Sequence, residues 1–330
     1  MSLINFVDVL RARETIAPYV NKTPTYPYIG LSKLVGAEIY LKHENHHALG
    51  SFKVRGGINY MSNLAAESKK RGVITASTGN HGQSIAYSAS VFGVPAVIVS
   101  PEDANTSKVE SMRNLGAELI LKGKNFDEAR ETVETEASNR GLTYIHAANE
   151  PLIIAGVATY GLEMLEDIPD IEVVIAPIGG GSNAAALCTV AKVINPKIQI
   201  IGVQSAQAPA AYQSWTSKGI KSAPTSTVAE GLATSIGFEL TQNILWELLD
   251  DFVLVDDKEI EDSIVTLATK AHTLAEEAGA STLACALKIK DRLSGKKVAL
   301  VISGGNLSLI HISEPTRRYA ISYAVFCLKK

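Results

Sequence analysis

Residues 73–100 read VITASTGNHGQSIAYSASVFGVPAVIVS, a stretch in which strand-like and helix-like composition alternate. The pattern predicts a strand at Val73–Ser77, a helix that continues to Phe92, and a second strand at Pro95–Ser100. Short apolar strands separated by longer helices indicate βαβ units, whose strands are parallel. Ligands bind beyond the carboxyl ends of such strands, so the polar residues at the end of the first strand are candidates for a binding site.

The same alternation extends along the rest of the chain. Further strands are expected at Ala117–Leu121, Leu142–His146, Val173–Pro177, Ile198–Val203 and Lys297–Ile302, and helices at Thr106–Leu115, Asp127–Asn139, from Ser182, at Asp257–Ala278 and at Thr282–Leu293. The segment Ala206–Thr227, rich in Ala, Ser and Pro, is expected to be a long loop. Two α/β units are predicted, with a break near Ala148–Pro151.

The composition limits the classes of protein to which the chain can belong. Its 330 residues are 46% hydrophobic, and 31 basic residues against 34 acidic ones give a net charge of −3. A nucleic-acid partner is not expected, because no basic excess is present to neutralise phosphates. No apolar run reaches the roughly 18–20 residues of a membrane span, and residues 1–20 do not resemble a signal peptide. Three widely separated cysteines, Cys188, Cys285 and Cys327, fit a reducing cytoplasm.

The segment His43–His47 matches H-E-x-x-H, the zinc-protease pattern. That chemistry needs both histidines on one turn of a helix. Here the motif follows a strand-like run at Glu38–Lys42 and reaches Gly50 three residues later, which leaves no room for the helix. We therefore interpret the segment as a polar loop and expect no zinc.

A glycine-rich loop, Gly179-Gly180-Gly181-Ser182, follows a strand and opens a helix. Glycines let the backbone approach an anion, and free amides at a helix start bind phosphate, so the loop predicts a phosphate site. It also fits the dinucleotide fingerprint, which requires an acidic residue at the end of the next strand. That strand ends in Gln204-Ser205, and a nicotinamide enzyme is therefore disfavoured.

Three more polar clusters need have no function when each is considered alone. Lys53 lies in the turn Gly50–Gly57 and could be a solvated lysine, while Ser77–Gly82 could be only a helix cap provided by Thr78 or Asn80. Ser303–Asn306 could be only a turn. Together with the phosphate loop, however, they supply a nucleophilic amine, a carboxylate pocket and a lone hydroxyl.

This combination resembles the pyridoxal-phosphate enzymes of fold type II, specifically the threonine/serine dehydratase and serine racemase family. The likeness extends from about Leu10 to Leu309 and rests on the segments GSFKVRG, STGNHGQ, GGGS, AEGLA, AEEAGA and SGGN in this order. The resemblance implies two open parallel-sheet α/β domains with helices on both faces, similar to the tryptophan synthase β subunit. Residues 1–54 and 149–310 would form the large domain and 55–148 a small inserted one, with pyridoxal phosphate in the cleft between them.

The resemblance also implies the roles of individual residues. Lys53 would form the Schiff base, Phe52 would stack near the ring, and Asn80 would bind the ring hydroxyl. The cofactor's phosphate would be held by Gly179, Gly180, Gly181 and Ser182, its pyridine nitrogen would face Ser303, and Glu276 would lie close to the ring. The substrate carboxylate would be received by Ser77, Thr78, Asn80 and His81. Lys53 and Thr78 would be the catalytic residues.

The expected activity is that of a threonine/serine ammonia-lyase, which converts L-threonine or L-serine into a 2-keto acid and ammonia. The alternatives are a serine racemase, because Thr78 stands where racemase-like relatives carry a serine, and a dehydratase of a larger substrate such as a β-aryl serine. Racemase-like relatives also bind a cation after the strand that ends here in Gln204. No acidic residue follows until Glu230, so no metal site is expected there.

Two further expectations concern the oligomeric state and the last residues of the chain. Family members are usually dimers or tetramers, which predicts a homodimer or homotetramer. Residues 311–330 lack helical periodicity and hold four basic residues against one acidic one. We expect this atypical tail not to be native to the fold.

Overall fold

Two sheets organise the computed structural model, which describes residues 4–124 and 126–307. Within these residues the larger sheet has the order β1 (Thr25–Pro27), β2 (Glu38–His43), β10 (Lys297–Ile302), β7 (Val173–Pro177), β8 (Gln199–Ser205) and β9 (Asp251–Val255). The smaller one has the order β5 (Glu118–Leu121), β4 (Ala96–Ser100), β3 (Val73–Ala76) and β6 (Thr143–Tyr144). All neighbouring strands are parallel except β1, which pairs antiparallel with β2.

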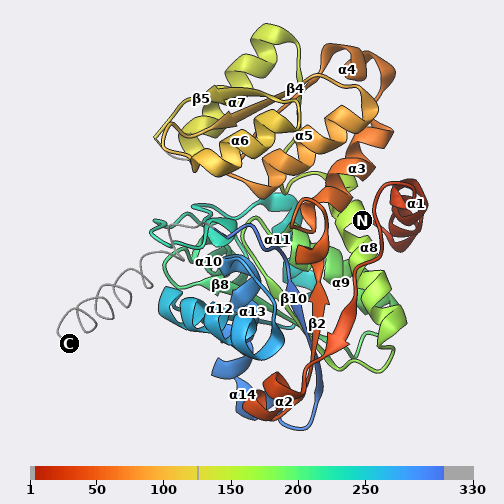
Figure 1. The fold of residues 1–330 in the computed structure, drawn as a ribbon, viewed down its shortest axis with the longest axis vertical. Coiled ribbons are helices and arrows are strands. Elements are labelled where there is room, and N and C mark those ends of the chain that lie inside the picture. Colours follow the sequence, from red (N-terminus) through yellow and green to blue (C-terminus); the bar gives the residue numbers. More distant parts are fainter. Residues whose placement is uncertain (1–3, 125, 308–330) are drawn as a thin grey trace, which may run out of the picture.

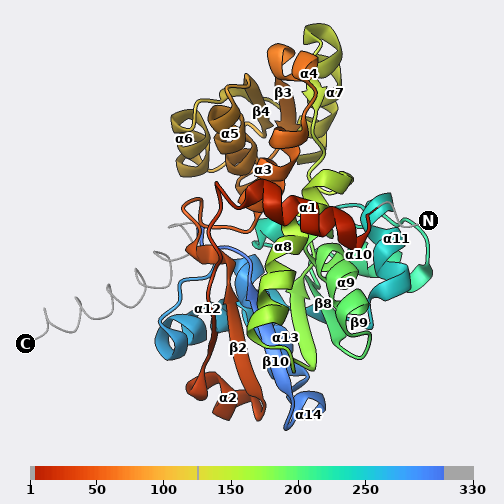
Figure 2. The same ribbon diagram turned by 90° about the vertical axis from the view of Figure 1, so that its right-hand side faces the viewer.

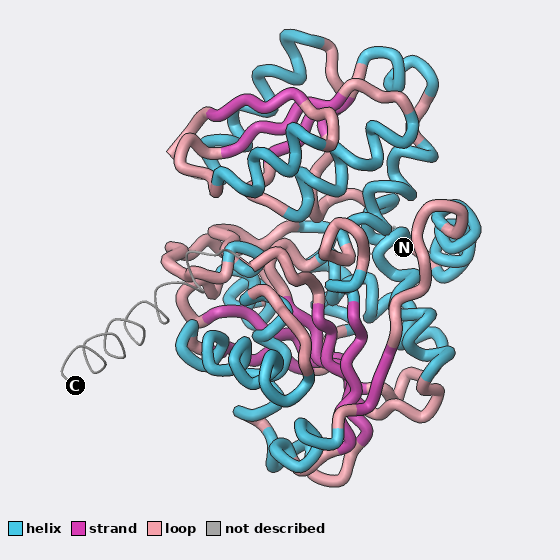
Figure 3. The backbone as a smooth tube through the Cα atoms, in the orientation of Figure 1, coloured by secondary structure: helices cyan, strands magenta, loops and turns pink. Residues whose placement is uncertain are grey.

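The helices surround these sheets, which lie one above the other in Figure 1 and are drawn in magenta in Figure 3. The helices of the lower half are α1 (Phe6–Ile16), α2 (Ile29–Val35), η1 (Glu44–His46), α8 (Pro151–Asp167), α9 (Ser182–Ile194), α10 (Ala210–Ser217), η2 (Glu230–Leu232), α11 (Glu239–Leu248), α12 (Asp257–Ala271), α13 (Glu277–Lys288) and α14 (Lys290–Leu293). Those of the upper half are α3 (Lys53–Asn63), α4 (Ala66–Arg71), α5 (Asn80–Phe92), α6 (Thr106–Asn114) and α7 (Phe126–Arg140). No helix among the described residues is long and apolar enough to cross a membrane.

Alternate residues of the small-sheet strands face opposite helices. Val73 shares an apolar cluster with Ile85 of α5, whereas its neighbour Ile74 packs with Ala129 of α7. Successive side chains of a strand point to opposite faces, so α5 and α7 cover the two sides of this sheet. Its strands lie inside the range 55–148 expected for the small domain, whose boundaries stay a prediction.

The large sheet is covered on both faces in the same way. Val174 belongs to the apolar cluster that contains Leu187 of α9, whereas Val173 belongs to the one that contains Leu283 of α13. Figure 2 shows α9 and α13 on opposite sides of the strands. The predicted α/β class, with open parallel sheets and helices on both faces, is confirmed.

Two predictions of local structure are wrong. The helix expected at Asp257–Ala278 ends at Ala271, because His272 adopts a left-handed conformation (φ 50°), and α13 begins only at Glu277. Histidine is an unusual residue for this turn, which glycine or asparagine normally makes. The expected loop Ala206–Thr227 contains α10, whose buried alanines pack on the core despite its loop-like composition. The predicted tail 311–330 lies outside the described residues.

A buried ionic network joins the elements around the start of α3. Arg55, which is fully buried, donates to both oxygens of Glu44 at 2.8 and 2.9 Å and to both oxygens of Glu163 at 2.6 and 2.8 Å. It also donates to Thr159 of α8, and Lys42 donates to Glu163. Burial alone would raise the pKa of Glu44, but the charges and hydrogen bonds of Arg55 and His47 together outweigh it and hold that pKa below its ordinary value.

This network also explains the H-E-x-x-H segment. Glu44, its glutamate, is the carboxylate that pairs with Arg55, and His47 adds a contact to it at 3.1 Å. The intervening residues form only the short η1, and the rings of His43 and His46 stack on each other at 4.4 Å. Among the described residues, no group of three His, Cys, Asp or Glu side chains could hold a metal ion.

We expect Arg55→Met to lower the apparent free energy of unfolding by about 3–5 kcal/mol, because it leaves the buried carboxylate of Glu44 and the partly buried one of Glu163 without their arginine. Urea denaturation followed by circular dichroism measures the loss. The control is Arg140→Met, which removes the exposed Arg140–Glu118 ion pair and should cost less than about 1 kcal/mol. Equal losses in the two variants would contradict this account of the network.

Candidate active site

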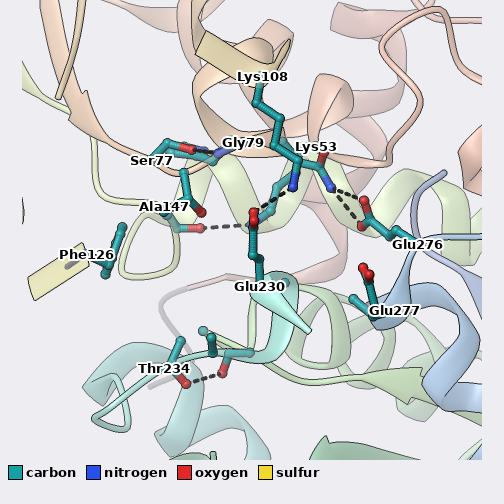
Figure 4. Close-up of a pocket in the computed structure, with 18 of the residues that line it drawn as sticks. Lys53, Ser77, Gly79, Lys108, Phe126, Ala147, Glu230, Thr234, Glu276 and Glu277 are labelled. Atoms are coloured by element: carbon teal, nitrogen blue, oxygen red, sulfur yellow. Dashed lines mark hydrogen bonds and ion pairs between the residues drawn. The ribbon is translucent and has the colours of Figure 1, made fainter. Parts of the chain in front are cut away.

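A cavity of about 510 Å³ lies at the carboxyl ends of strands from both sheets. Residues that follow β3, β7 and β10 line it, together with the start of α3 and the start of α13. Figure 4 shows Ser77 after β3, Lys53 of α3 and Glu277 of α13 around this space. Every predicted site residue borders this cavity: Phe52, Lys53, Ser77, Thr78, Asn80, His81, Gly179, Gly180, Gly181, Ser182, Glu276 and Ser303. The fold therefore brings together segments that are more than two hundred residues apart in the chain.

Lys53, the first residue of α3, points into the middle of the cavity (Figure 4). Its Nζ lies 3.4 Å from Ser182 Oγ, 3.5 Å from the Ala147 carbonyl oxygen and 5.1 Å from the centre of the Phe52 ring. The side chain borders open space, but the surrounding protein desolvates its amine and lowers the pKa to about 8, against the opposing charge of Glu276. About a tenth of the amine is then neutral at pH 7, as a nucleophile or base requires.

The segment after β3 begins helix α5 with an internal cap. Ser77 Oγ accepts the N–H groups of Gly79 and Gly82 at 3.0 and 2.8 Å, so the hydroxyl that caps these groups belongs to Ser77 and not to Thr78 or Asn80, which were the alternatives considered for a cap. His81 is buried, and its Nε2 lies 3.0 Å from Thr75 Oγ1. Burial lowers its pKa well below the ordinary value, so the ring is neutral. The side chains of Ser77 and His81 are thus engaged with the protein itself.

The loop Gly179–Ser182 lies between β7 and α9, and its three glycines leave no room for side chains. A Cβ on Gly179 would come within 2.2 Å of the Gly231 carbonyl oxygen, and Gly181 has a φ of 91°. Helix α9 has no side-chain cap, so its first N–H groups are available where the loop borders the cavity. Free amides at a helix start, beside the buried amine of Lys53, fit the phosphate and the aldehyde of pyridoxal phosphate.

A second group of contacts surrounds Asn80. Its Nδ2 donates to both carboxylate oxygens of Glu276, at 2.8 and 3.0 Å, and its Oδ1 accepts from Asn306 Nδ2 at 2.7 Å. Burial raises the pKa of Glu276, although the bond from Asn80 opposes this rise. Ser303, only 2% exposed, lines the same side of the site at the end of β10. Our sequence analysis missed Asn306, although it quoted the SGGN segment that contains it.

The ion pair between Lys108 of α6 and Glu230 of η2 was also missed. The Lys108 amine lies 2.6 Å from the Glu230 carboxylate, so this ion pair joins a helix beside the small sheet to a segment beside the large sheet. Both residues line the cavity (Figure 4). Glu230 lies in the quoted AEGLA segment, but no feature of the sequence singled out Lys108.

Gln204 occupies the position where a cation ligand was considered. Its buried amide accepts from the backbone N–H of Tyr212 at 3.1 Å and donates to the Leu232 carbonyl oxygen and to Thr234 Oγ1, both at 3.5 Å. The amide thus ties two loops of the large half together. The absence of a metal requirement stays a prediction.

Comparison with known proteins agrees with this geometry. An L-threonine ammonia-lyase of Thermotoga maritima is 41% identical over 310 residues, which cover 93% of this chain and 77% of that protein. The L-threonine dehydratase catabolic TdcB of Staphylococcus aureus is 38% identical over 316 residues, which cover 94% of this chain and 91% of that one. A maize serine racemase structure superposes with a TM-score of 0.90 at 31% identity, covering 97% of this chain and 99% of the other.

The match to a protein family covers most of the chain. Residues 16–304 match the family described as pyridoxal-phosphate-dependent enzymes. This range includes Lys53, the Gly179–Ser182 loop and Ser303, which confirms the predicted cofactor and the fold-type II resemblance. The chain therefore belongs to the family of pyridoxal-phosphate-dependent enzymes.

Proposed function

We propose that this protein is an ammonia-lyase that converts L-threonine, and also L-serine, into a 2-keto acid and ammonia. The observation that carries the proposal is the desolvated amine of Lys53 in a cavity that the Gly179–Ser182 loop and the Ser77–His81 segment also border. Relatives named threonine ammonia-lyase and threonine dehydratase, at 41% and 38% identity, support it. A cytoplasmic location and a homodimer or homotetramer belong to the same proposal.

Each residue of the site has its own role in the elimination. Pyridoxal phosphate, when bound, supplies an aldehyde that condenses with amines and a ring that draws electrons from Cα. Lys53 Nζ removes the Cα proton, because its lowered pKa keeps part of the amine neutral. Thr78, Asn80 and the first N–H groups of α5 receive the substrate carboxylate. The Gly179–Ser182 loop holds the cofactor's phosphate.

Ser303 favours elimination over other reactions of the same cofactor. When pyridoxal phosphate is bound, Ser303 would face the ring nitrogen with a neutral hydroxyl, which would not stabilise a protonated ring as a carboxylate would. Such a ring would favour loss of the β-hydroxyl over transamination. Glu276, the buried carboxylate of the site, is bound by Asn80 rather than by Ser303.

A serine racemase is the second candidate, and the maize structure with its TM-score of 0.90 is the observation that favours it. Racemisation needs a second proton carrier on the face of Cα opposite Lys53. Thr78, which borders the cavity, offers a hydroxyl for this role. Its methyl group crowds the same space, so we rank this activity below elimination.

Purified protein supplied with pyridoxal phosphate should release 2-keto acid and ammonia in equal amounts from L-threonine and L-serine. Lys53→Ala should reduce turnover by about 10³-fold or more, because the nucleophile and base are lost together. The control is Lys270→Ala, a substitution of an exposed lysine, which should leave turnover unchanged. D-serine formed from L-serine faster than keto acid would contradict the lyase and favour the racemase.

The rate at which the cofactor-free protein takes up pyridoxal phosphate should rise about tenfold per pH unit below pH 8 and level off above it. Only the neutral amine attacks an aldehyde, and burial lowers the pKa of Lys53 from 10.5 to about 8. Stopped-flow absorbance measures this rate. A rate that continues to climb to pH 10 would indicate an ordinary, solvated lysine instead.

Ser303→Asp should lower the turnover number for keto-acid formation by about tenfold or more, because a carboxylate would stabilise a protonated ring nitrogen. Ser294→Asp adds the same charge at an exposed position and should leave turnover unchanged. Coupled dehydrogenase assays measure both variants. Full activity in Ser303→Asp would refute the role given to the hydroxyl.

A further inference from the structure

The turn that follows β10 is hydrogen-bonded to the segment that leads into α3. The backbone N–H of Phe52 donates to the Ser303 carbonyl oxygen at 3.1 Å, and that of Gly305 donates to the Gly50 carbonyl oxygen at 2.8 Å. These bonds place Asn306, the next residue along the turn, beside that segment. The backbone thus fixes the position from which the Asn306 side chain extends.

The amide of Asn306 makes two contacts that set its orientation. Its Nδ2 donates to the Leu49 carbonyl oxygen at 2.8 Å and to Asn80 Oδ1 at 2.7 Å. Because both acceptors are oxygens, only the amino group of Asn306 can face them. The oxygen of the same amide occupies the space beside Gly50, where a Cβ would come within 2.6 Å of it.

The contact with Asn306 in turn fixes the amide of Asn80. Since Asn80 Oδ1 accepts from Asn306, its Nδ2 is directed away from that residue and donates to both carboxylate oxygens of Glu276, at 2.8 and 3.0 Å. Asn80 and Glu276 line the active-site cavity, whereas Asn306 is not among the residues that border it. A residue outside the cavity therefore sets the orientation of a donor inside it.

The orientation of the Asn80 amide matters for the charge of the bound cofactor. We expect Asn80 to bind the ring hydroxyl of pyridoxal phosphate, and an amino group stabilises that oxygen when it is ionised. In a reversed amide the carbonyl oxygen would face the ring hydroxyl instead and would favour its protonated form. The two orientations therefore have opposite effects on the ionisation of the ring hydroxyl.

We propose that Asn306 is a positioning residue that holds the amino group of Asn80 toward the ring hydroxyl of the cofactor. Its second bond, to the Leu49 carbonyl oxygen, holds the same amide beside the segment that leads to Lys53. The reactive amine and the donor for the ring hydroxyl are thereby tied to one turn. This inference goes beyond the proposed ammonia-lyase function, because it concerns the cofactor alone and applies to any reaction at this site.

The test measures the absorbance spectrum of the protein loaded with pyridoxal phosphate, without substrate, and the dissociation constant of the cofactor. Asn80→Ala should reduce the long-wavelength band, which reports the ionised ring oxygen, and weaken cofactor binding by about tenfold or more. Asn306→Ala should change both in the same direction, with binding about threefold weaker. In the double variant the two losses should not multiply, because Asn306 acts through Asn80.

Two further variants separate the amide of Asn306 from the packing of its turn. Asn306→Asp keeps the shape of the side chain but presents only acceptors to Asn80 Oδ1. It favours the reversed amide and should reduce the long-wavelength band more than Asn306→Ala does. The matched control is Asn45→Ala, because Asn45 packs beside Gly305 but donates to the Leu274 carbonyl oxygen, at 2.9 Å, and not to Asn80. This control should leave the spectrum unchanged.

The opposite results overturn the inference. An unchanged spectrum in Asn306→Ala, or an equal change in Asn45→Ala, would remove Asn306 from this role. Losses that multiply in the double variant would show that Asn306 acts by a route other than Asn80. If Asn306→Ala does not fold, Asn306→Asp carries the test, and an unchanged spectrum there has the same meaning.

The expected role of Asn80 and the proposed function are tested separately from that of Asn306. If Asn80→Ala leaves the spectrum unchanged, Asn80 does not bind the ring hydroxyl, and the inference about Asn306 fails with it. The spectrum and the dissociation constant need no turnover of threonine or serine. Failure of the ammonia-lyase proposal is therefore distinguished from failure of this inference.

Discussion

The position of the reactive amine depends on a guanidinium that is fully buried. Arg55 stands on the first turn of α3, two residues after Lys53, and its hydrogen bonds reach Glu44 after β2 and Glu163 on α8. The start of α3 is thereby fixed to the large sheet and to the helix beside it. A charge network of this kind is stable in the interior only when every partner is in place, so it permits little freedom at Lys53.

The cavity follows from this constraint and from the parallel sheets. Loops after β7 and β10 open at the same edge because these parallel strands belong to one sheet, and the loop after β3 of the smaller sheet lines the same cavity. Within that space, desolvation lowers the pKa of Lys53 to about 8, and the uncapped start of α9 leaves its amides open. The same fold therefore produces both the base and the anion site.

Much of the fold and of the site could be predicted because the signals are local. Apolar runs predicted the central strands, and the three consecutive glycines predicted the phosphate-binding loop GGGS. Contacts between residues far apart in the sequence gave no such signal. Asn80 is hydrogen-bonded to Asn306, 226 positions away, and Lys108 is paired with Glu230, 122 positions away. The turn at His272 was missed for a different reason, since a histidine adopts the left-handed backbone that a glycine or asparagine would have signalled in the sequence.

The central claim is that the amine of Lys53 itself moves the Cα proton. The most direct measurement is chemical rescue of Lys53→Ala, loaded with pyridoxal phosphate and L-threonine, by small primary amines added to the solution. The account predicts keto-acid formation at least about 10³-fold slower than in the wild type without added amine, and a rate that rises with the concentration of methylamine or ethylamine. Turnover by Lys53→Ala at a rate near that of the wild type, independent of added amine, would contradict it.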